Sequence, residues 1–111
     1  MATKTISQAT KPILEELRLE LQQIYKGKFK HLILYGSYAR GEANEDSDID
    51  VVAVIESIES PVKELGKLSN LISRISLKYD TLISLYPISM DDFERRASPL
   101  LLNVKKEGIS V

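Results

Sequence analysis

The chain has 111 residues, a net charge of -1, and 43% hydrophobic and 28% charged residues, which suits one soluble globular domain over residues 1–111. The near-neutral charge argues against direct nucleic-acid binding, and the absence of cysteine excludes disulfides and zinc–thiolate sites. No apolar stretch reaches the length of a membrane span or of a signal-peptide core, so we expect a cytoplasmic protein that does not bind membranes.

The first predicted element is a packing helix without chemistry. Thr10 is placed to cap it, Pro12 falls in the first turn, where proline is tolerated, and Gly27 is expected to end it. Its apolar residues recur at helical spacing: Ile13, Leu14, Leu17, Leu21 and Ile24.

A short apolar run, Leu32–Tyr35, predicts a strand that ends at a Gly-Ser turn. Gly36 lets the backbone approach a ligand closely. Ser37 offers a hydroxyl and an N–H to a phosphate, and a helix beginning there would favour an anion at its N-terminus. The turn is therefore expected to bind phosphate.

A second strand, running to Ile55, opens with two acids, Asp48 and Asp50. Because side chains alternate along a strand, both acids point to one side while Ile49 points into the core. Two neighbouring carboxylates repel each other, and burying them is costly unless a cation lies between them. Mg²⁺ held by carboxylates and substrate phosphates is the usual solution. A solvent-exposed acidic strand start does not explain why both acids open a continuous apolar run.

The segment GSYARGEANEDSDID, residues 36–50, resembles the G-S-x10-D-x-D signature of the DNA polymerase β-like nucleotidyltransferase superfamily. A D-x-D pair alone is common, but Gly-Ser at this distance from it, with strands on both sides, is specific. The flanking residues 39–42 and 46–47 are similar to those of the minimal nucleotidyltransferases (MNT), many of which are antitoxins paired with HEPN-domain toxins.

This resemblance implies roles for five residues. Gly36 and Ser37 would hold the triphosphate of ATP, and Asp48 and Asp50 would be catalytic and bind Mg²⁺, with two ions in the site. In the superfamily a third carboxylate from a neighbouring strand completes the metal site, and Asp80 matches that position. Its alternative role is that of an ordinary turn residue between helix and strand.

The resemblance also implies a reaction and a partner. Adenylyl transfer from ATP would modify a tyrosine hydroxyl of a cognate HEPN ribonuclease toxin within a hetero-oligomer. Two alternatives remain open: a non-catalytic antitoxin that masks its partner by contact, and a small-molecule transferase of the aminoglycoside-modifying type. Enzymes of the second type usually have an added acceptor domain, which this sequence lacks.

Arg40 lies just past the Gly-Ser turn, where a short helix would direct it toward phosphates. Because a guanidinium matches phosphate oxygens well, we assign Arg40 to nucleotide binding. A salt bridge to Glu42 or Glu45 is the alternative. Asp46 is interpreted as a loop or capping residue, because it lies outside the strand alternation.

The remaining sequence predicts a helix, a strand and a further helix. Ser60 and Pro61 form a good helix start, and the helix is expected to reach about Lys78. Its apolar stripe comprises Val62, Leu65, Leu68, Ile72 and Ile75, widened by Leu71. A third strand is expected over Asp80–Tyr86, ended by Pro87.

The further helix is interrupted at Ser98, where it is expected to restart, and it is expected to end at Gly108. A final strand can follow it. The consecutive Leu100–Leu102 cannot all face one narrow core stripe, so they either face a partner or lie in a helix buried on two sides. The order of elements predicts an α/β (α+β) fold, with a small mixed sheet covered by helices, like the superfamily's palm.

Overall fold

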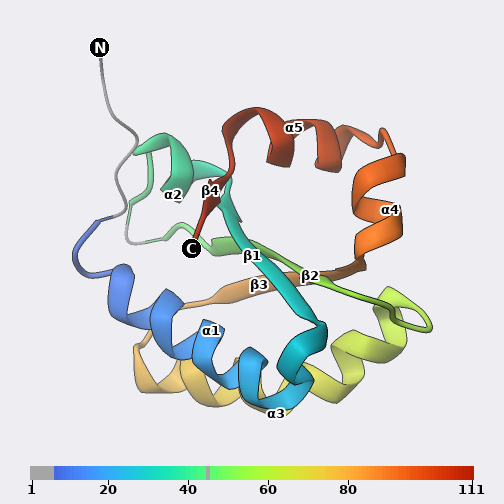
Figure 1. The fold of residues 1–111 in the computed structure, drawn as a ribbon. Helices are drawn as coiled ribbons and strands as arrows, with labels where there is room; N and C mark the ends of the chain where they lie inside the picture. The colour runs from blue at the N-terminus through green and yellow to red at the C-terminus, as the bar shows by residue number, and fades with distance from the viewer. Residues whose placement is uncertain (1–6, 45) are drawn as a thin grey trace.

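The computed structural model describes residues 7–44 and 46–111, so the alternative pairing of Arg40 with Glu45 lies outside the described residues. A four-stranded sheet lies between two layers of helices (Figure 1). The elements are α1 (Lys11–Tyr25), a 3-10 turn η1 (Lys26–Lys28), β1 (Phe29–Tyr35), α2 (Ser37–Arg40), β2 (Ile49–Ile55), α3 (Pro61–Lys78), β3 (Ile83–Ser89), α4 (Met90–Arg95), α5 (Pro99–Glu107) and β4 (Ile109–Ser110).

The sheet is mixed, with strand order β3-β2-β1-β4. Strand β1 is antiparallel to both β2 and β4, whereas β2 and β3 are parallel and joined through α3. Parallel strands need such a crossover, and a helix is the usual connection. The expected small mixed sheet covered by helices is confirmed.

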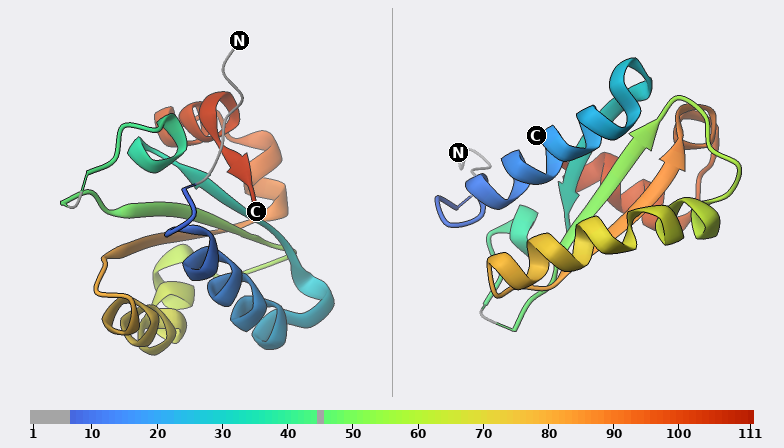
Figure 2. Two further views of the ribbon diagram at one scale, coloured as in Figure 1. Left: turned by 90° about the vertical axis from the view of Figure 1, so that its left-hand side faces the viewer. Right: turned by 90° about the horizontal axis from the view of Figure 1, so that it is seen from below.

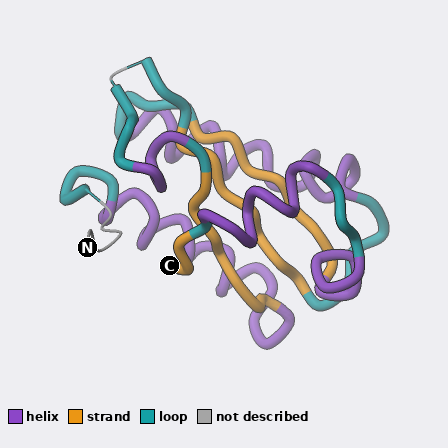
Figure 3. Tube along the Cα trace, turned by 90° about the horizontal axis from the view of Figure 1, so that it is seen from above, coloured by secondary structure: helices purple, strands orange, loops and turns teal. Residues whose placement is uncertain are grey.

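Alternate residues of the central strands face two separate cores. Leu34 and Val51 pack with α1 and α3 on one face, and these two helices run side by side in the view from below (Figure 2). Val52 and Val54 point the other way, toward Ile88 of β3 and Leu101 and Val104 of α5. Figure 3 shows this second face, where the shorter helices cross the strands. Both faces of β2 are therefore buried, which explains its continuous apolar run.

The first helix differs from its sequence prediction at both ends. The Thr10 side chain makes no capping bond to the helix, and its hydroxyl instead bonds to the Ser7 hydroxyl at 2.6 Å. The helix ends at Tyr25, and Lys26 (φ 54°), rather than Gly27, takes the positive φ. Ile24 is 52% exposed, whereas Tyr25 in the same turn packs against the first core.

The third helix begins as expected, since the Ser60 hydroxyl accepts a hydrogen bond from the Lys63 N–H at 3.2 Å. Its buried face is offset, however. Val62 is 82% and Leu65 41% exposed, while Glu64 is 4% exposed. The carboxylate of Glu64 takes the inward position in the first turns because the Tyr25 hydroxyl of α1 donates a hydrogen bond to it.

The third strand was expected at Asp80–Tyr86, but it begins later and continues through Pro87 to Ser89. Strand β3 is an edge strand paired only with β2. Proline is tolerated at an edge, because its missing N–H can face away from the ladder.

The three consecutive leucines of α5 lie in different environments. Leu101 is 2% exposed and lies in the second core, whereas Leu102 is 56% exposed. Leu100 is partly buried against the same core. Strand β4 follows Gly108 as expected. None of the described helices has the length and apolar character needed to cross a bilayer.

Candidate active site

The antiparallel register brings the Gly-Ser turn and the acids to one end of the sheet. Tyr35, the last residue of β1, lies opposite Asp50 in β2, so the chain enters Gly36 beside that carboxylate. Ile49 stands between the two acids in the sequence and is only 1% exposed, which confirms that its side chain points into the core. Asp48 lies just before β2 and is exposed, while Asp50 is partly buried.

Gly36 fits closely against Asp50. Its φ is 77°, and a Cβ added there would lie 2.6 Å from Asp50 Oδ2, a distance no real side chain tolerates. The backbone conformation therefore favours glycine, and a side chain there would also displace the Asp50 carboxylate. Ser37 then begins the short helix α2.

Burial and like charge both act on Asp50. Burial raises its pKa above the ordinary value, and the negative charge of Asp48 raises it further, while the positive charge of Arg40 opposes the rise. The pKa of the Tyr35 hydroxyl is also raised, first by burial and then by Asp50. The two aspartates are thus close enough to repel each other, the condition under which a bound cation is favourable.

The structure places Arg40 in a network of carboxylates. Arg40 Nε lies 2.8 Å from Glu42 Oε1, so the salt bridge left open by the sequence is present. Arg40 Nη1 also lies 3.0 Å from Glu107 Oε1, a residue 67 positions away. Sequence reasoning missed this second pair, because no local pattern links α2 to the end of α5. A contact between Arg40 and phosphate stays a prediction.

The structure does not bring Asp80 into a cluster with the other two acids. Asp80 lies in the turn after α3 with a φ of 50°, and the β3 residue beside Asp50 is Ser84. Within residues 7–44 and 46–111, no three His, Cys, Asp or Glu side chains come close enough to hold one metal ion. The reason is that β3 begins only at Ile83, so Asp80 lies in the turn before the strand joins the sheet.

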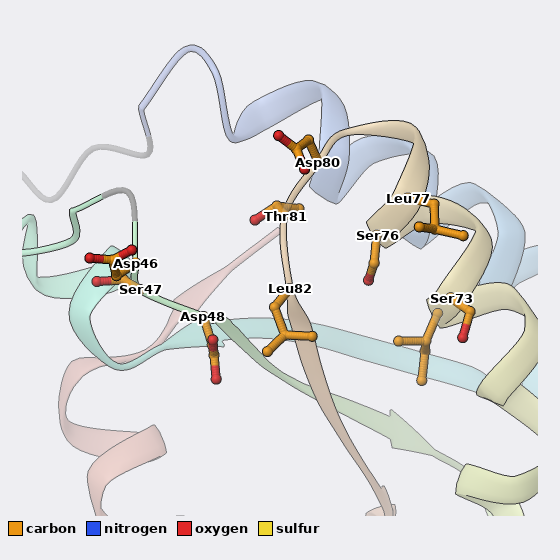
Figure 4. Close-up of a pocket in the computed structure, with 10 residues that line it drawn as sticks. Asp46, Ser47, Asp48, Ser73, Ser76, Leu77, Asp80, Thr81 and Leu82 are labelled. Carbon is orange, nitrogen blue, oxygen red and sulfur yellow. The ribbon is translucent and has the colours of Figure 1, made fainter.

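A pocket of about 540 Å³ adjoins this end of the sheet. Asp46 and Asp48 line it from the loop before β2, and Asp80 lines it from the turn before β3 (Figure 4). The Ser76 hydroxyl in its wall is buried and has no hydrogen-bond partner among the described residues. Asp80 and Asp48 therefore line the same pocket, but they are not part of a cluster of three possible metal ligands in the part of the chain that the structure describes. No sequence signal marked the α3 residues that complete this wall.

The oxygen donors present suit a hard divalent cation. Mg²⁺ in nucleotide enzymes is commonly held by one or two carboxylates together with substrate phosphates. Asp48 and Asp50 supply two carboxylates, and Gly36 brings the backbone of the Gly-Ser turn against Asp50. The residues therefore fit Mg²⁺ with a nucleotide, although the third carboxylate expected from the sequence is not part of the set.

Comparison with known proteins decides the family, because the family model described as "Nucleotidyltransferase domain" matches residues 14–105. The chain belongs to the nucleotidyltransferase domain family. A Methanocaldococcus jannaschii protein, MJ0141, provisionally named a protein adenylyltransferase, is 43% identical over 72 residues, which cover 65% of this chain and 72% of that protein. The resemblance to the minimal nucleotidyltransferases and the expected enzyme class are confirmed.

Two solved structures share the nucleotidyltransferase fold. A chain from a toxin–antitoxin crystal structure with AMP-PNP superposes with a TM-score of 0.62 at 19% identity, over 86% of this chain and 70% of that one. A chain from the Shewanella oneidensis complex of a tri-AMPylated HEPN toxin with an MNT antitoxin gives a TM-score of 0.52 at 19% identity, over 89% and 69% of the two chains. At these identities the likeness shows the fold alone.

Proposed function

We propose that this nucleotidyltransferase is a Mg²⁺-dependent antitoxin that transfers AMP from ATP to a tyrosine hydroxyl of a HEPN toxin. The main support is the contact between the Gly-Ser turn and the acid pair, where Gly36 leaves space against Asp50 that any side chain would fill. The name of MJ0141 and the AMPylated toxin in the Shewanella oneidensis complex support a protein acceptor.

Each site residue has a distinct part in the proposed reaction. The backbone at Gly36 and the hydroxyl of Ser37 hold the triphosphate, and the Arg40 guanidinium neutralises phosphate charge. Asp48 and Asp50 would hold Mg²⁺, which orients the triphosphate, lowers the pKa of the acceptor hydroxyl and stabilises developing charge. The remaining catalysis is positioning and electrostatics.

The transfer step exchanges a phosphoanhydride bond of ATP for a phosphoester bond to the acceptor. The acceptor oxygen attacks the α-phosphorus, a new O–P bond forms, and the bond from the α-phosphorus to the bridging oxygen breaks as pyrophosphate leaves. The hydroxyl proton passes to a carboxylate of the site, and Asp50, which lies against the Gly-Ser turn, is the proton acceptor we assign.

We assign the pocket beside Asp48 to the acceptor. Asp46, Asp48 and Asp80 line this pocket, while Arg40 lies with the Gly-Ser turn, so we place the triphosphate at the turn and the acceptor in the pocket. Asp80 thereby has a role in receiving the acceptor rather than in binding the metal. Asp80→Asn should reduce transfer to the protein acceptor while leaving ATP affinity unchanged; a loss of ATP binding as large as that in Asp50→Asn would restore Asp80 as a metal ligand.

The proposal is tested with ATP labelled at the α-phosphate, Mg²⁺, and the protein encoded in the neighbouring reading frame as acceptor. Label should appear on a tyrosine of that protein and be lost with EDTA or in Asp50→Asn. The matched control is Asp91→Asn, whose carboxylate pairs with Arg95 on α4 and should leave transfer intact. Tight binding and neutralisation without any label would instead indicate a contact antitoxin.

A further inference from the structure

The ion pair between Arg40 and Glu107 joins two elements that the sequence separates widely. Arg40 is the last residue of α2, and Glu107 is the last residue of α5. Arg40 Nη1 lies 3.0 Å from Glu107 Oε1, and Arg40 Nε lies 2.8 Å from Glu42 Oε1. The C-terminal end of the chain therefore contacts the element that follows the phosphate-binding turn.

Glu107 is fixed by the chain that follows it. The Gly108 N–H bonds to the Val104 carbonyl at 2.8 Å, and a Cβ at Gly108 would lie 2.6 Å from Ile33 Cγ2. Ile109 then pairs with Leu34 of β1. The end of α5 is thus packed against the strand that leads into the Gly-Ser turn, so the position of the Glu107 carboxylate is tied to that turn.

The two carboxylates leave part of the guanidinium available. Arginine has five N–H donors in a planar fork, and the contacts to Glu42 and Glu107 use Nε and Nη1, so donors on Nη2 remain. Arg40 is also near enough to Asp50 for its positive charge to oppose the rise in that group's pKa. Holding the fork in place before a phosphate arrives reduces the conformational entropy lost on binding.

We propose that Glu107 is a positioning residue that orients Arg40 toward the phosphates of the bound nucleotide. This inference rests on the proposed nucleotide site. Stability alone does not explain the arrangement, because an ion pair whose Arg40 side chain is 44% exposed contributes little to folding. The C-terminal helix and strand are thereby part of the nucleotide site, although they contain none of its signature residues.

The test measures binding of the Mg²⁺ complex of AMP-PNP by titration calorimetry to the full chain and to Glu107→Gln. The dissociation constant should rise roughly two- to fivefold, and Glu107→Asp should restore part of the loss. In transfer assays the KM for ATP should rise by a similar factor with kcat nearly unchanged. Thermal unfolding of each variant separates this effect from a general loss of structure.

The matched control is Glu20→Gln, which removes a similar pair, Arg74–Glu20 at 3.1 Å, between α1 and α3. It should leave AMP-PNP affinity unchanged. Unchanged or tighter binding in Glu107→Gln would overturn the inference, because removing a nearby negative charge without any loss of orientation should favour the anionic ligand. Failure of the unaltered protein to bind Mg²⁺–AMP-PNP would instead overturn the proposed function itself.

Discussion

Gly36 combines a backbone and a steric requirement in one residue. Its φ of 77° and ψ of -156° lie where glycine is nearly the only residue found. A Cβ would also lie 2.6 Å from Asp50 Oδ2, so a side chain would displace the carboxylate. The Gly-Ser turn and Asp50 therefore pack together at the one position where the chain has no side chain.

Gly36→Ala should lower the free energy of unfolding by about 2–4 kcal/mol and abolish AMP transfer. The loss combines backbone strain with displacement of Asp50. Urea unfolding and transfer of labelled AMP measure the two effects.

Gly41→Ala measures the effect of backbone strain without a steric clash. Gly41 has a φ of 74°, but nothing lies within 4 Å of an added Cβ. We expect a loss of about 1–2 kcal/mol with transfer largely retained. Equal effects of the two substitutions on transfer would refute the steric role of Gly36.

Asp50→Asn should make the apo protein slightly more stable at pH 7, by a few tenths of a kcal/mol. The folded pKa of Asp50 is raised, so ionising it costs the folded state more than the unfolded state. The penalty is absent below the ordinary carboxyl pKa, grows as the pH rises through the folded pKa, and is complete above it. Urea unfolding at a series of pH values measures the difference.

Mg²⁺ with AMP-PNP should reverse this order, because a cation between Asp48 and Asp50 relieves their repulsion and binds only the folded protein. The unaltered protein should gain stability and Asp50→Asn should gain little. A stability difference that does not change with pH would show that repulsion is not its cause.

Between elements, the contact of α1 with α3 includes a buried carboxylate. Glu64 is 4% exposed, and the Tyr25 hydroxyl donates a hydrogen bond to it, while Lys67 Nζ lies 3.7 Å away. Burial and the Glu64 carboxylate both raise the pKa of Tyr25. This pair explains why the apolar stripe of α3 is offset from the one its leucines predicted.

Tyr25→Phe should lower the free energy of unfolding by about 1–3 kcal/mol, because a buried carboxylate loses its hydrogen-bond donor. Thermal unfolding followed by circular dichroism measures the change. The control is Tyr79→Phe, since the Tyr79 hydroxyl bonds at 2.8 Å to a more exposed carboxylate, Glu16, that also pairs with Lys78. A loss no greater than that of the control would contradict the role of the buried pair.

At the scale of the whole molecule, the two cores share their central strands. Strand β2 buries alternate residues in the core beneath α1 and α3 and in the core beneath α4 and α5. Because both cores pack on the same strand, neither core can lose that strand without exposing the residues of the other core. The chain is therefore expected to behave as one domain despite its two helix layers.

Chemical unfolding should show a single transition for both cores. Tyr25, Tyr38 and Tyr79 pack against the first core, and Tyr35 and Tyr86 against the second, so phenylalanine variants of either set leave tyrosine fluorescence from the other. Both fluorescence curves should coincide with the far-ultraviolet circular dichroism curve. A fluorescence midpoint that differs from the circular dichroism midpoint of the same variant would show that the two layers unfold independently.

Features that depend on neighbouring residues could be predicted before the fold was known. The Gly-Ser turn, the alternation of Ile49 and Asp50, and the serine caps of α3 and α5 are local patterns, and each is found where it was predicted, whereas Asp48 lies just before the strand it was expected to open. These patterns were enough to indicate the fold class and the family.

Features that depend on distant segments could be seen only in the folded chain. The tertiary structure placed Glu107 against Arg40, left Asp80 in the turn before β3, and turned Glu64 rather than Leu65 inward. The physical reason is that strand register and helix rotation are set by packing against elements far away in the chain, which local propensity does not encode.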